Sequence, residues 1–473
     1  MTGPPVGCRA FTAGCRAFTA GADSAIAGLL PDSVRTRFPG AGACNYLNTA
    51  NVCLMHEGAE RAALEWQIDV SRHGSNHFDE VAEEDAFAAL HNAGAALFGC
   101  SPRDVAAGSS ATELLASVAW GVMPPRGSNI VGTASCFPST MYPWARVAQH
   151  TGAEVRLAAA SPPSAPPSST GVGASSRTAL TPAGLGPMPI GTGITDPDAI
   201  EDLIDANTAA VVLSHVEYGT GQRYCLRRMA RKAHTVGALL VVDATQSAGV
   251  VPIDVSPGTP PAEGEGGQPR HGDAAPGEAG AGAEVGVDVL VSAAYKWLAG
   301  PFGAALMYVS PALQRRIVPG LVGFRSPRDM WQLDADYDRL RLDDDASRFE
   351  FATMAFGAAQ ALAASVEYLC GSEVGVSSAQ RHTLALTDRL DTGLRALGFD
   401  ILSPREHAHE RSAIIAAAIP EALPPADELK SLLAQRERIH VSNRGGMLRV
   451  SPHVYNTADD IEHLLFALYK MLP

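Results

Sequence analysis

The stretch Asp288-Val-Leu-Val-Ser-Ala-Ala-Tyr-Lys296-Trp-Leu-Ala-Gly-Pro-Phe-Gly303 decides the fold of this chain. It is a short apolar run typical of a buried strand, with one lysine near its end and a Gly-Pro turn that closes it. A lysine is seldom buried without a partner, so Lys296 is either a charge at the surface end of a strand or a reactive amine. This stretch alone favours the surface charge.

A second stretch, Ala238-Leu-Leu-Val-Val-Asp243-Ala-Thr-Gln246-Ser-Ala-Gly249, changes that balance. It predicts another buried strand, which ends in an acid and then a turn of small residues. A carboxylate and a lysine at the ends of two strands suit pyridoxal phosphate (PLP). The lysine would form the Schiff base, and the acid would pair with the protonated pyridine nitrogen.

A Gly-Ser-Ser turn from Gly108 leads from a predicted strand end into an apolar helix. The start of a helix exposes unpaired N–H groups and the positive end of the helix dipole, so it can hold a phosphate. Ser110, Ala111 and Thr112 stand where those donors would be. The alternative is an ordinary N-cap with Glu113 in the first turn, which the turn on its own favours.

The alternation of strands and helices predicts an α/β fold with a mostly parallel sheet and helices on both faces. Ligands of such sheets gather at the carboxyl ends of the strands. We expect a disordered tail over 1–28, a large domain over 29–320 with low-complexity insertions at 158–195 and 256–283, and a smaller α+β domain over 321–473. Helices are predicted over 58–98 (interrupted at 72–77), 196–206, 226–236, 356–370, 377–397 and 458–471, and strands over 209–214, 412–419 and 447–451.

Composition narrows the class of protein. The chain has 473 residues, 46% of them hydrophobic, and a formal net charge of −14. The charge argues against nucleic acid or an anionic membrane surface as a partner, and no apolar run approaches the roughly 18 residues of a membrane span. Eight cysteines without a CxxC pair are typical of reduced thiols in a cytoplasmic enzyme. A tandem repeat over 8–21 with two arginines is a weak targeting signal, and a disordered tail fits it better.

No metal site is expected. His73 and His77 interrupt the long helix, but they lack a metal-ligand spacing such as HExxH, so each is read as a solvent-facing or satisfied histidine. Arg444 and Arg449 lie near the ends of predicted strands. Each would either make a salt bridge or, facing a cofactor, hold a substrate carboxylate.

With these segments in place, the chain resembles the class V aminotransferase family of fold-type I PLP enzymes. This family includes cysteine desulfurases, selenocysteine lyases, kynureninases and isopenicillin N epimerase-like proteins. The resemblance runs from about Tyr46 to the C-terminus, apart from the two insertions, and rests on several motifs in the family's order.

Three of these motifs concern the cofactor directly. Ser110-Ala-Thr112-Glu matches the family's phosphate loop. Asp243 and Gln246 match its Asp-x-x-Gln motif, in which the glutamine bonds the 3-oxygen of the cofactor. Lys296 matches the Schiff-base lysine.

The resemblance also assigns residues around the ring and the substrate. Phe137 falls on the ring-stacking position, aligned by the Tyr-Pro-Trp144 that follows. Thr353 is similar to a threonine that acts across the subunit interface, although Ala352 replaces the family's glycine before it. Arg449 matches the arginine that binds the substrate carboxylate.

Three departures from the desulfurase pattern are informative. Phe137 stands where desulfurases commonly have histidine, and Tyr295 precedes the lysine as in kynureninases, where it reaches the phosphate. Only Gly-Gly-Met-Leu separates Arg444 from Arg449, whereas desulfurases carry their nucleophilic cysteine on a loop there. Persulfide chemistry by the usual route is therefore not expected. Cys53 and Cys136 are read as small buried thiols.

The resemblance implies an enzyme that acts on an α-amino acid through a Schiff base with PLP, with Lys296 as general base and Asp243 keeping the ring nitrogen protonated. Arg449, Arg444 and Asn51 would bind the substrate, in a side-chain pocket formed by loops around Asn51, His56, His77 and Arg325. The leading hypothesis is a C–S lyase-type β-elimination. An aminotransferase with a keto-acid acceptor, a kynureninase-like hydrolase and, least favoured, a silent scaffold are the alternatives. A homodimer is implied through Thr353.

Overall fold

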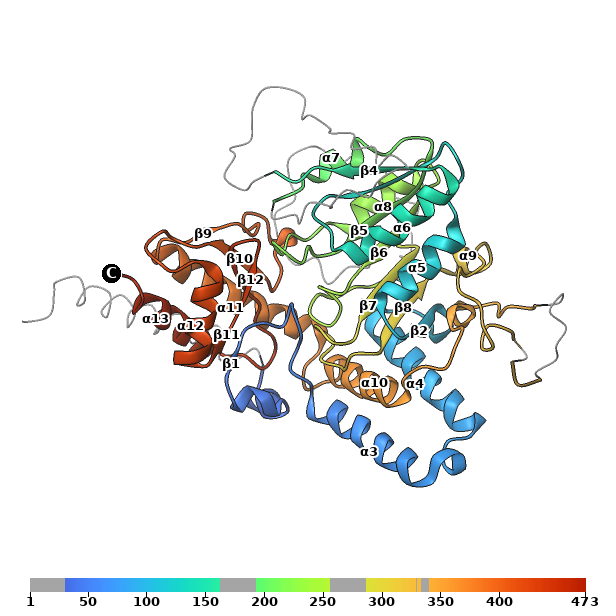
Figure 1. Ribbon diagram of the computed structural model, residues 1–473, viewed down its shortest axis with the longest axis horizontal. Helices are drawn as coiled ribbons and strands as arrows, with labels where there is room; N and C mark the ends of the chain where they lie inside the picture. The colour runs from blue at the N-terminus through green and yellow to red at the C-terminus, as the bar shows by residue number, and fades with distance from the viewer. Residues whose placement is uncertain (1–29, 162–192, 256–285, 329, 333–339) are drawn as a thin grey trace, which may run out of the picture.

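The computed structural model describes residues 30–161, 193–255, 286–328, 330–332 and 340–473. Its largest element is a seven-stranded sheet in the order β2-β8-β7-β6-β5-β3-β4 (Figure 1). β8 runs antiparallel to β2 and β7, and the other neighbours are parallel, so the predicted fold-type I class with a mostly parallel sheet is confirmed. The strands are β2 Val105–Gly108, β3 Asn129–Thr133, β4 Glu154–Ala158, β5 Thr208–Ser214, β6 Leu239–Asp243, β7 Val289–Ala293 and β8 Ala305–Val309.

Helices cover both faces of this sheet because its buried side chains alternate between two apolar cores. Leu240 and Val242 of β6 belong to one core with α4, α8 and α10, whereas Val241 belongs to the other with α5 and α6. The helices around the sheet are α3 Glu57–His73, α4 Glu80–Phe98, α5 Ala111–Val122, α6 Pro138–Thr151, α7 Pro197–Glu201, α8 Leu226–His234, α9 Pro311–Gln314 and α10 Phe356–Cys370.

A second, antiparallel sheet of four strands in the order β12-β13-β10-β9 forms the C-terminal part, with its own core (Figure 1). Its strands are β9 Asp400–Ile401, β10 Ile415–Ala418, β12 Ser442–Arg444 and β13 Met447–Val450, and its helices are α11 Val376–Ala396, α12 Ala426–Glu437 and α13 Ala458–Tyr469. The helices predicted over 356–370, 377–397 and 458–471 agree with these bounds to within two residues.

The packing differs from the predicted two-domain division in two places. β1, Asn45–Tyr46, pairs in parallel with β11, Ile439–His440, and Leu47 lies in the C-terminal core, although residue 29 onward was assigned to the large domain. α10, assigned to the small domain, packs on α3 and α4, and its Leu362 and Val366 lie in a core of the large sheet. Short-range patterns carry no information on such long-range packing, and the boundaries at 29, 320 and 321 stay a prediction.

Three of the predicted segments lie wholly or mostly outside the described residues. They are the tail over 1–28, the insertion over 256–283 and all but the flanks of the insertion over 158–195. Those flanks meet, because Ser161 and Ile194 exchange two backbone hydrogen bonds of 2.9 Å. Within the described part of the chain, no helix is long and apolar enough to cross a membrane.

Candidate active site

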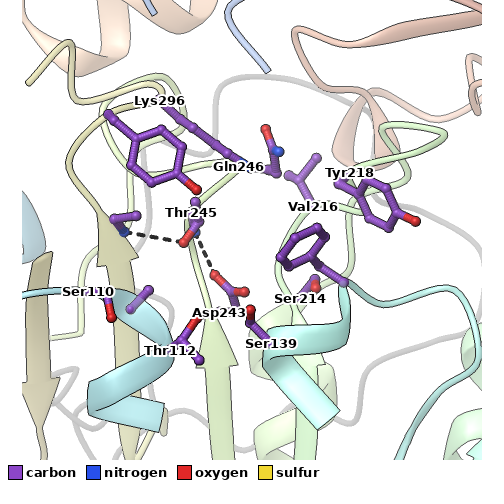
Figure 2. A pocket seen from close by; sticks show the side chains of 14 residues that line it. Ser110, Thr112, Ser139, Ser214, Val216, Tyr218, Asp243, Thr245, Gln246 and Lys296 are labelled. Carbon is purple, nitrogen blue, oxygen red and sulfur yellow. Dashed lines mark hydrogen bonds between the residues drawn. The ribbon is translucent and has the colours of Figure 1, made fainter. Parts of the chain in front are cut away.

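A pocket opens at the carboxyl ends of the parallel strands. β6 ends at Asp243, and the neighbouring strand β7 ends at Ala293, from which a turn carries Tyr295 and Lys296. Figure 2 shows the side chains of Lys296 and Asp243 at the same pocket. The amine and the acid, which lie on two strands far apart in sequence, therefore lie at the same edge of the sheet, as the sequence predicts.

The Lys296 side chain is only 8% exposed. Burial lowers the pKa of its amine to about 8, and the nearby charges of Arg449 and Arg444 act in the same direction, while Asp243 opposes them. A buried amine of lowered pKa is partly neutral at physiological pH and can act as a nucleophile or a base.

Asp243 and Gln246 are held rigidly by their neighbours. One carboxylate oxygen of Asp243 accepts a hydrogen bond from the backbone N–H of Thr245 at 2.9 Å, and the other accepts from the hydroxyl of Thr140 at 2.9 Å (Figure 2 shows the first). Gln246 donates to the backbone oxygen of Ala50 at 3.0 Å and accepts from the indole of Trp297 at 2.8 Å. These contacts fix the orientation of both side chains toward the pocket.

The starts of two helices converge on one side of the pocket. Ser110 caps α5 by accepting from the backbone N–H of Glu113 at 3.2 Å, and Ala111 and Thr112 begin the helix. The hydroxyl of Thr112 donates to that of Ser139, in the first turn of α6, at 2.9 Å. N–H groups in a first helical turn have no acceptor within the helix, so the two helix starts and three hydroxyls on this side of the pocket could hold an anion such as a phosphate. The phosphate-loop and N-cap interpretations of Ser110 are thus compatible.

Aromatic rings surround the amine. The Lys296 nitrogen lies 5.4 Å from the ring centroid of Phe137 and 5.7 Å from that of Tyr295. Phe137 meets Tyr218 edge to face at 5.2 Å, and Tyr295 stacks on the exposed ring of Phe302 at 4.3 Å. Phe137 is itself partly exposed, so its face is available to a flat ligand.

The two arginines lie on one hairpin of the C-terminal sheet. Ser442 pairs with Arg449 across β12 and β13, and Arg444 is two residues from Ser442, so both guanidinium groups leave the same face. Gly445 and Gly446 form the turn, both with positive φ, which only glycine adopts easily. Asn51 accepts from Arg444 at 2.9 Å, so it stands beside this pair.

Arg449 is a buried cation with an unused donor. It is 1% exposed and donates from Nε to Ser442 at 3.0 Å and from Nη1 to the backbone oxygen of Tyr218 at 2.6 Å. Its Nη2 has no hydrogen-bond partner in the described part of the molecule, and no carboxylate there forms an ion pair with it. Burial and the charge of Arg444 lower the pKa of Arg449 to about 9. Such a group favours an incoming anion, because an unpaired buried charge is costly.

A buried carboxyl anchors the loop that carries Tyr218. Glu217 is 1% exposed, and burial raises its pKa to about 7. Its Oε2 lacks a hydrogen-bond partner among the described residues. Its Oε1 accepts from the hydroxyls of Thr133 and Ser135, each at 2.9 Å, and of Tyr224 at 3.3 Å. Glu217 therefore fixes the segment whose next residue supplies both a wall of the pocket and an acceptor for Arg449.

Eight of the nine predicted cofactor residues line this pocket, and one does not. The eight are Ser110, Ala111, Thr112, Phe137, Asp243, Gln246, Tyr295 and Lys296. Thr353 lies exposed on a separate hollow beside Gly108 and Ser109. The lining also lacks the predicted substrate residues Asn51, Arg444 and Arg449, as well as His56, His77 and Arg325, which were expected around the substrate side chain. Lining residues that the sequence did not predict are Ser139, Ser214, Val216, Tyr218, Thr245 and Ala293.

None of the missed residues carried a motif of its own. Ser139 lies in the first turn of a helix and Ser214 ends a strand, so position at an element end was the only available signal. Cysteines are absent from the lining of this pocket. Cys53 and Cys136 are buried, and burial raises the pKa of both thiols, which leaves them protonated and unreactive.

The residues of the pocket fit PLP. They provide a nucleophilic amine for its aldehyde, a carboxylate for its ring nitrogen, the Phe137 face for its ring and helix starts for its phosphate. Lys296, Asp243, Phe137 and Thr112 would hold these four parts.

The chain has relatives among known proteins. The chain is similar to a probable cysteine desulfurase of Methanothermobacter thermautotrophicus, 25% identical over 58% of this chain and 62% of that protein, so it spans less than two thirds of that relative. It is also similar to the uncharacterized aminotransferase YcbU of Bacillus subtilis, 25% identical over 92% of this chain and 96% of the other.

Among solved structures, the cystine C–S lyase C-DES in complex with cysteine persulfide superposes with a TM-score of 0.71 and 20% identity, over 92% of this chain and all of the other, which shows a shared fold. The model of the class-V aminotransferase family matches residues 181–258 and 281–464, together more than half of the chain. The chain therefore belongs to the class-V aminotransferase family, whose members are PLP-dependent enzymes.

Proposed function

We propose that this enzyme eliminates a sulfur substituent from the β-carbon of a cysteine-type α-amino acid. The observation that carries the proposal is the combination of a pocket lined by Lys296 and Asp243 with a buried, unpaired arginine and no lining thiol. A persulfide-forming desulfurase needs a cysteine nucleophile at the substrate sulfur, and the two-glycine turn between Arg444 and Met447 leaves no loop to carry one. The solved C–S lyase with the same fold supports this reaction class.

Each side chain has a defined task in this reaction. Nη2 of Arg449 would bind the substrate carboxylate in a charge-assisted hydrogen bond, with Arg444 and Asn51 alongside. Bound PLP would supply an electron sink for the negative charge that develops at Cα. Asp243 keeps that sink protonated through the two contacts that orient its carboxylate.

Lys296 moves the proton. Its Nζ has a pKa lowered to about 8, so it can take a proton from Cα and give it to the departing sulfur as the Cβ–S bond breaks. The sulfur leaves as a thiol, or as a persulfide when the substrate is cystine, and one water converts the remaining three-carbon unit to pyruvate and ammonia. The reaction therefore consumes one water for each substrate.

A cysteine-type substrate tests the proposal directly. Purified enzyme is incubated with an S-alkyl cysteine, without any keto acid, and pyruvate, ammonia and thiol are measured, with Lys296→Ala as the matched control. Equal amounts of the three products from the wild type alone support the lyase. Conversion of an added keto acid into its amino acid, without pyruvate, favours the aminotransferase. Release of anthranilate from kynurenine favours the hydrolase.

We further infer a homodimer. Thr353 is exposed at the hollow beside Gly108 and Ser109, close to the start of α5, and Phe302, which stacks on Tyr295, is 62% exposed. A second copy that covers this face would bury both. Sedimentation of the wild type as a monomer at micromolar concentration contradicts this inference. A cytoplasmic location stays a prediction.

A further inference from the structure

Two histidines and an aspartate meet at the end of α3, on residues that the proposed reaction does not use. Asp69 and His73 are four residues apart and lie on the same helix face. The helix ends at His73, and Gly74, with φ of +57°, turns the chain into the short 3-10 turn Gly74–Asn76. That turn returns His77 to the same face, so three residues spaced by four meet in space.

The contacts of this cluster are close. Nδ1 of His77 lies 3.0 Å from Oδ1 of Asp69, and Nε2 of His73 lies 3.8 Å from the same oxygen. The two imidazole rings stack with their centroids 4.2 Å apart. One potential ligand atom from each residue lies within 4.8 Å of the other two. The three side chains are thus already gathered at the spacing that one metal ion spans.

The charge of the cluster favours a cation. Two imidazoles share one carboxylate at the C-terminal end of a 17-residue helix, where the helix dipole is negative. A divalent ion would satisfy both rings and the carboxylate at once. The sequence expectation that these histidines merely face solvent omits this arrangement, because the helix break hides the regular spacing.

We propose that Asp69, His73 and His77 form a surface site for a divalent transition-metal ion of the zinc class. Two imidazole nitrogens and one carboxylate oxygen form a donor set that suits zinc, nickel or cobalt, whereas magnesium and calcium prefer oxygen ligands alone. Both histidines are exposed, so water would complete the coordination. The bound ion would tie the last turn of α3 to the segment leading into α4.

The test is a calorimetric titration of the PLP-bound enzyme with zinc chloride, in the wild type and in His73→Ala, His77→Ala and Asp69→Asn. We expect the wild type to bind one zinc ion per chain. Each variant should lose this binding or bind zinc at least about tenfold more weakly, since even substitutions of residues that only support a metal ligand lower the affinity about tenfold. His234→Ala is the matched control, because His234 is also exposed and pairs with one carboxylate, Asp288, at 2.9 Å. It should bind zinc as the wild type does.

Two outcomes overturn the proposal. One is an identical zinc titration in the wild type and the three variants. The other is equal competition by magnesium, which would indicate attraction by charge alone. The PLP absorbance and the pyruvate assay are recorded for every variant. Zinc binding and elimination are thus scored separately, and failure of one does not imply failure of the other.

Discussion

Substitution of Glu217 by glutamine should change how the stability of the enzyme depends on pH. Glu217 is buried, and its Oε1 accepts three hydroxyl donors, which a glutamine oxygen can accept equally well. The substitution therefore keeps the shape and these hydrogen bonds but removes the titration. It isolates the cost of ionising this one buried group.

The magnitude follows from the pKa of Glu217, which burial raises from 4.5 to about 7. Between these values the unfolded chain has lost the proton while the folded chain keeps it, so the free energy of unfolding falls as the pH rises. A tenfold change in proton affinity is worth about 1.4 kcal/mol. The wild type should therefore lose about 2 to 3 kcal/mol relative to Glu217→Gln between pH 5 and pH 8, and nothing further above that.

Urea unfolding of both proteins at several pH values, followed by tryptophan fluorescence, measures this difference. The two proteins share all other titrating groups, so the contributions of those groups cancel in the difference between the two free energies of unfolding. Glu421→Gln removes an exposed carboxylate and should follow the wild type at every pH. A constant difference between the wild type and Glu217→Gln from pH 5 to pH 8 would refute the reasoning, because it would mean that Glu217 is ionised in the folded protein at pH 5.

Three further predictions concern the pocket itself. Since burial lowers the pKa of Lys296 to about 8, the rate at which the cofactor-free protein binds PLP should rise about tenfold per pH unit below pH 8 and level off above it. Stopped-flow absorbance measures this rate, and a rate that stays constant from pH 6 to pH 9 contradicts the prediction. Arg449→Met should lower kcat/KM for an amino acid by about 100-fold, because it removes a charged hydrogen bond of about 3 kcal/mol. Ser442→Ala leaves the guanidinium in place and should lower kcat/KM by about tenfold or less. Equal losses of kcat/KM for the two variants in steady-state assays would contradict the role of Arg449 in binding the substrate carboxylate. Thr140→Val keeps the side-chain shape but removes the hydroxyl that donates to Asp243, so kcat should fall at least about tenfold while the PLP absorbance is unchanged. An unchanged kcat would show that this hydrogen bond does not contribute to catalysis.

The core of the site could be predicted from sequence because its parts are local. Asp243 ends an apolar strand, Lys296 follows another, and Ser110 and Thr112 begin a helix. Each position is set by a few neighbouring residues, and the rule that ligands gather at strand carboxyl ends brings the positions together. No local sequence pattern identifies Phe137 as a pocket residue, and it was predicted only from the resemblance to the family.

What could not be predicted depends on contacts between distant segments. The hydroxyl of Thr140 reaches Asp243 across 103 positions, and Tyr218 offers Arg449 its carbonyl oxygen across 231. No local sequence pattern in a helix or in an irregular loop predicts which distant residue a side chain will contact. The pairing of β1 with β11 is of the same kind, since it joins the two ends of the chain.

The bridge between Ser161 and Ile194 has a consequence for how this protein can vary. Two backbone hydrogen bonds hold these two residues together just beyond the end of β4, although they lie far apart in sequence. For a segment whose ends are joined in this way, the entropy cost of closure grows only with the logarithm of the segment's length, and doubling that length costs about 0.6 kcal/mol. Adding or removing residues between Ser161 and Ile194 should therefore change the free energy of unfolding by less than about 1 kcal/mol.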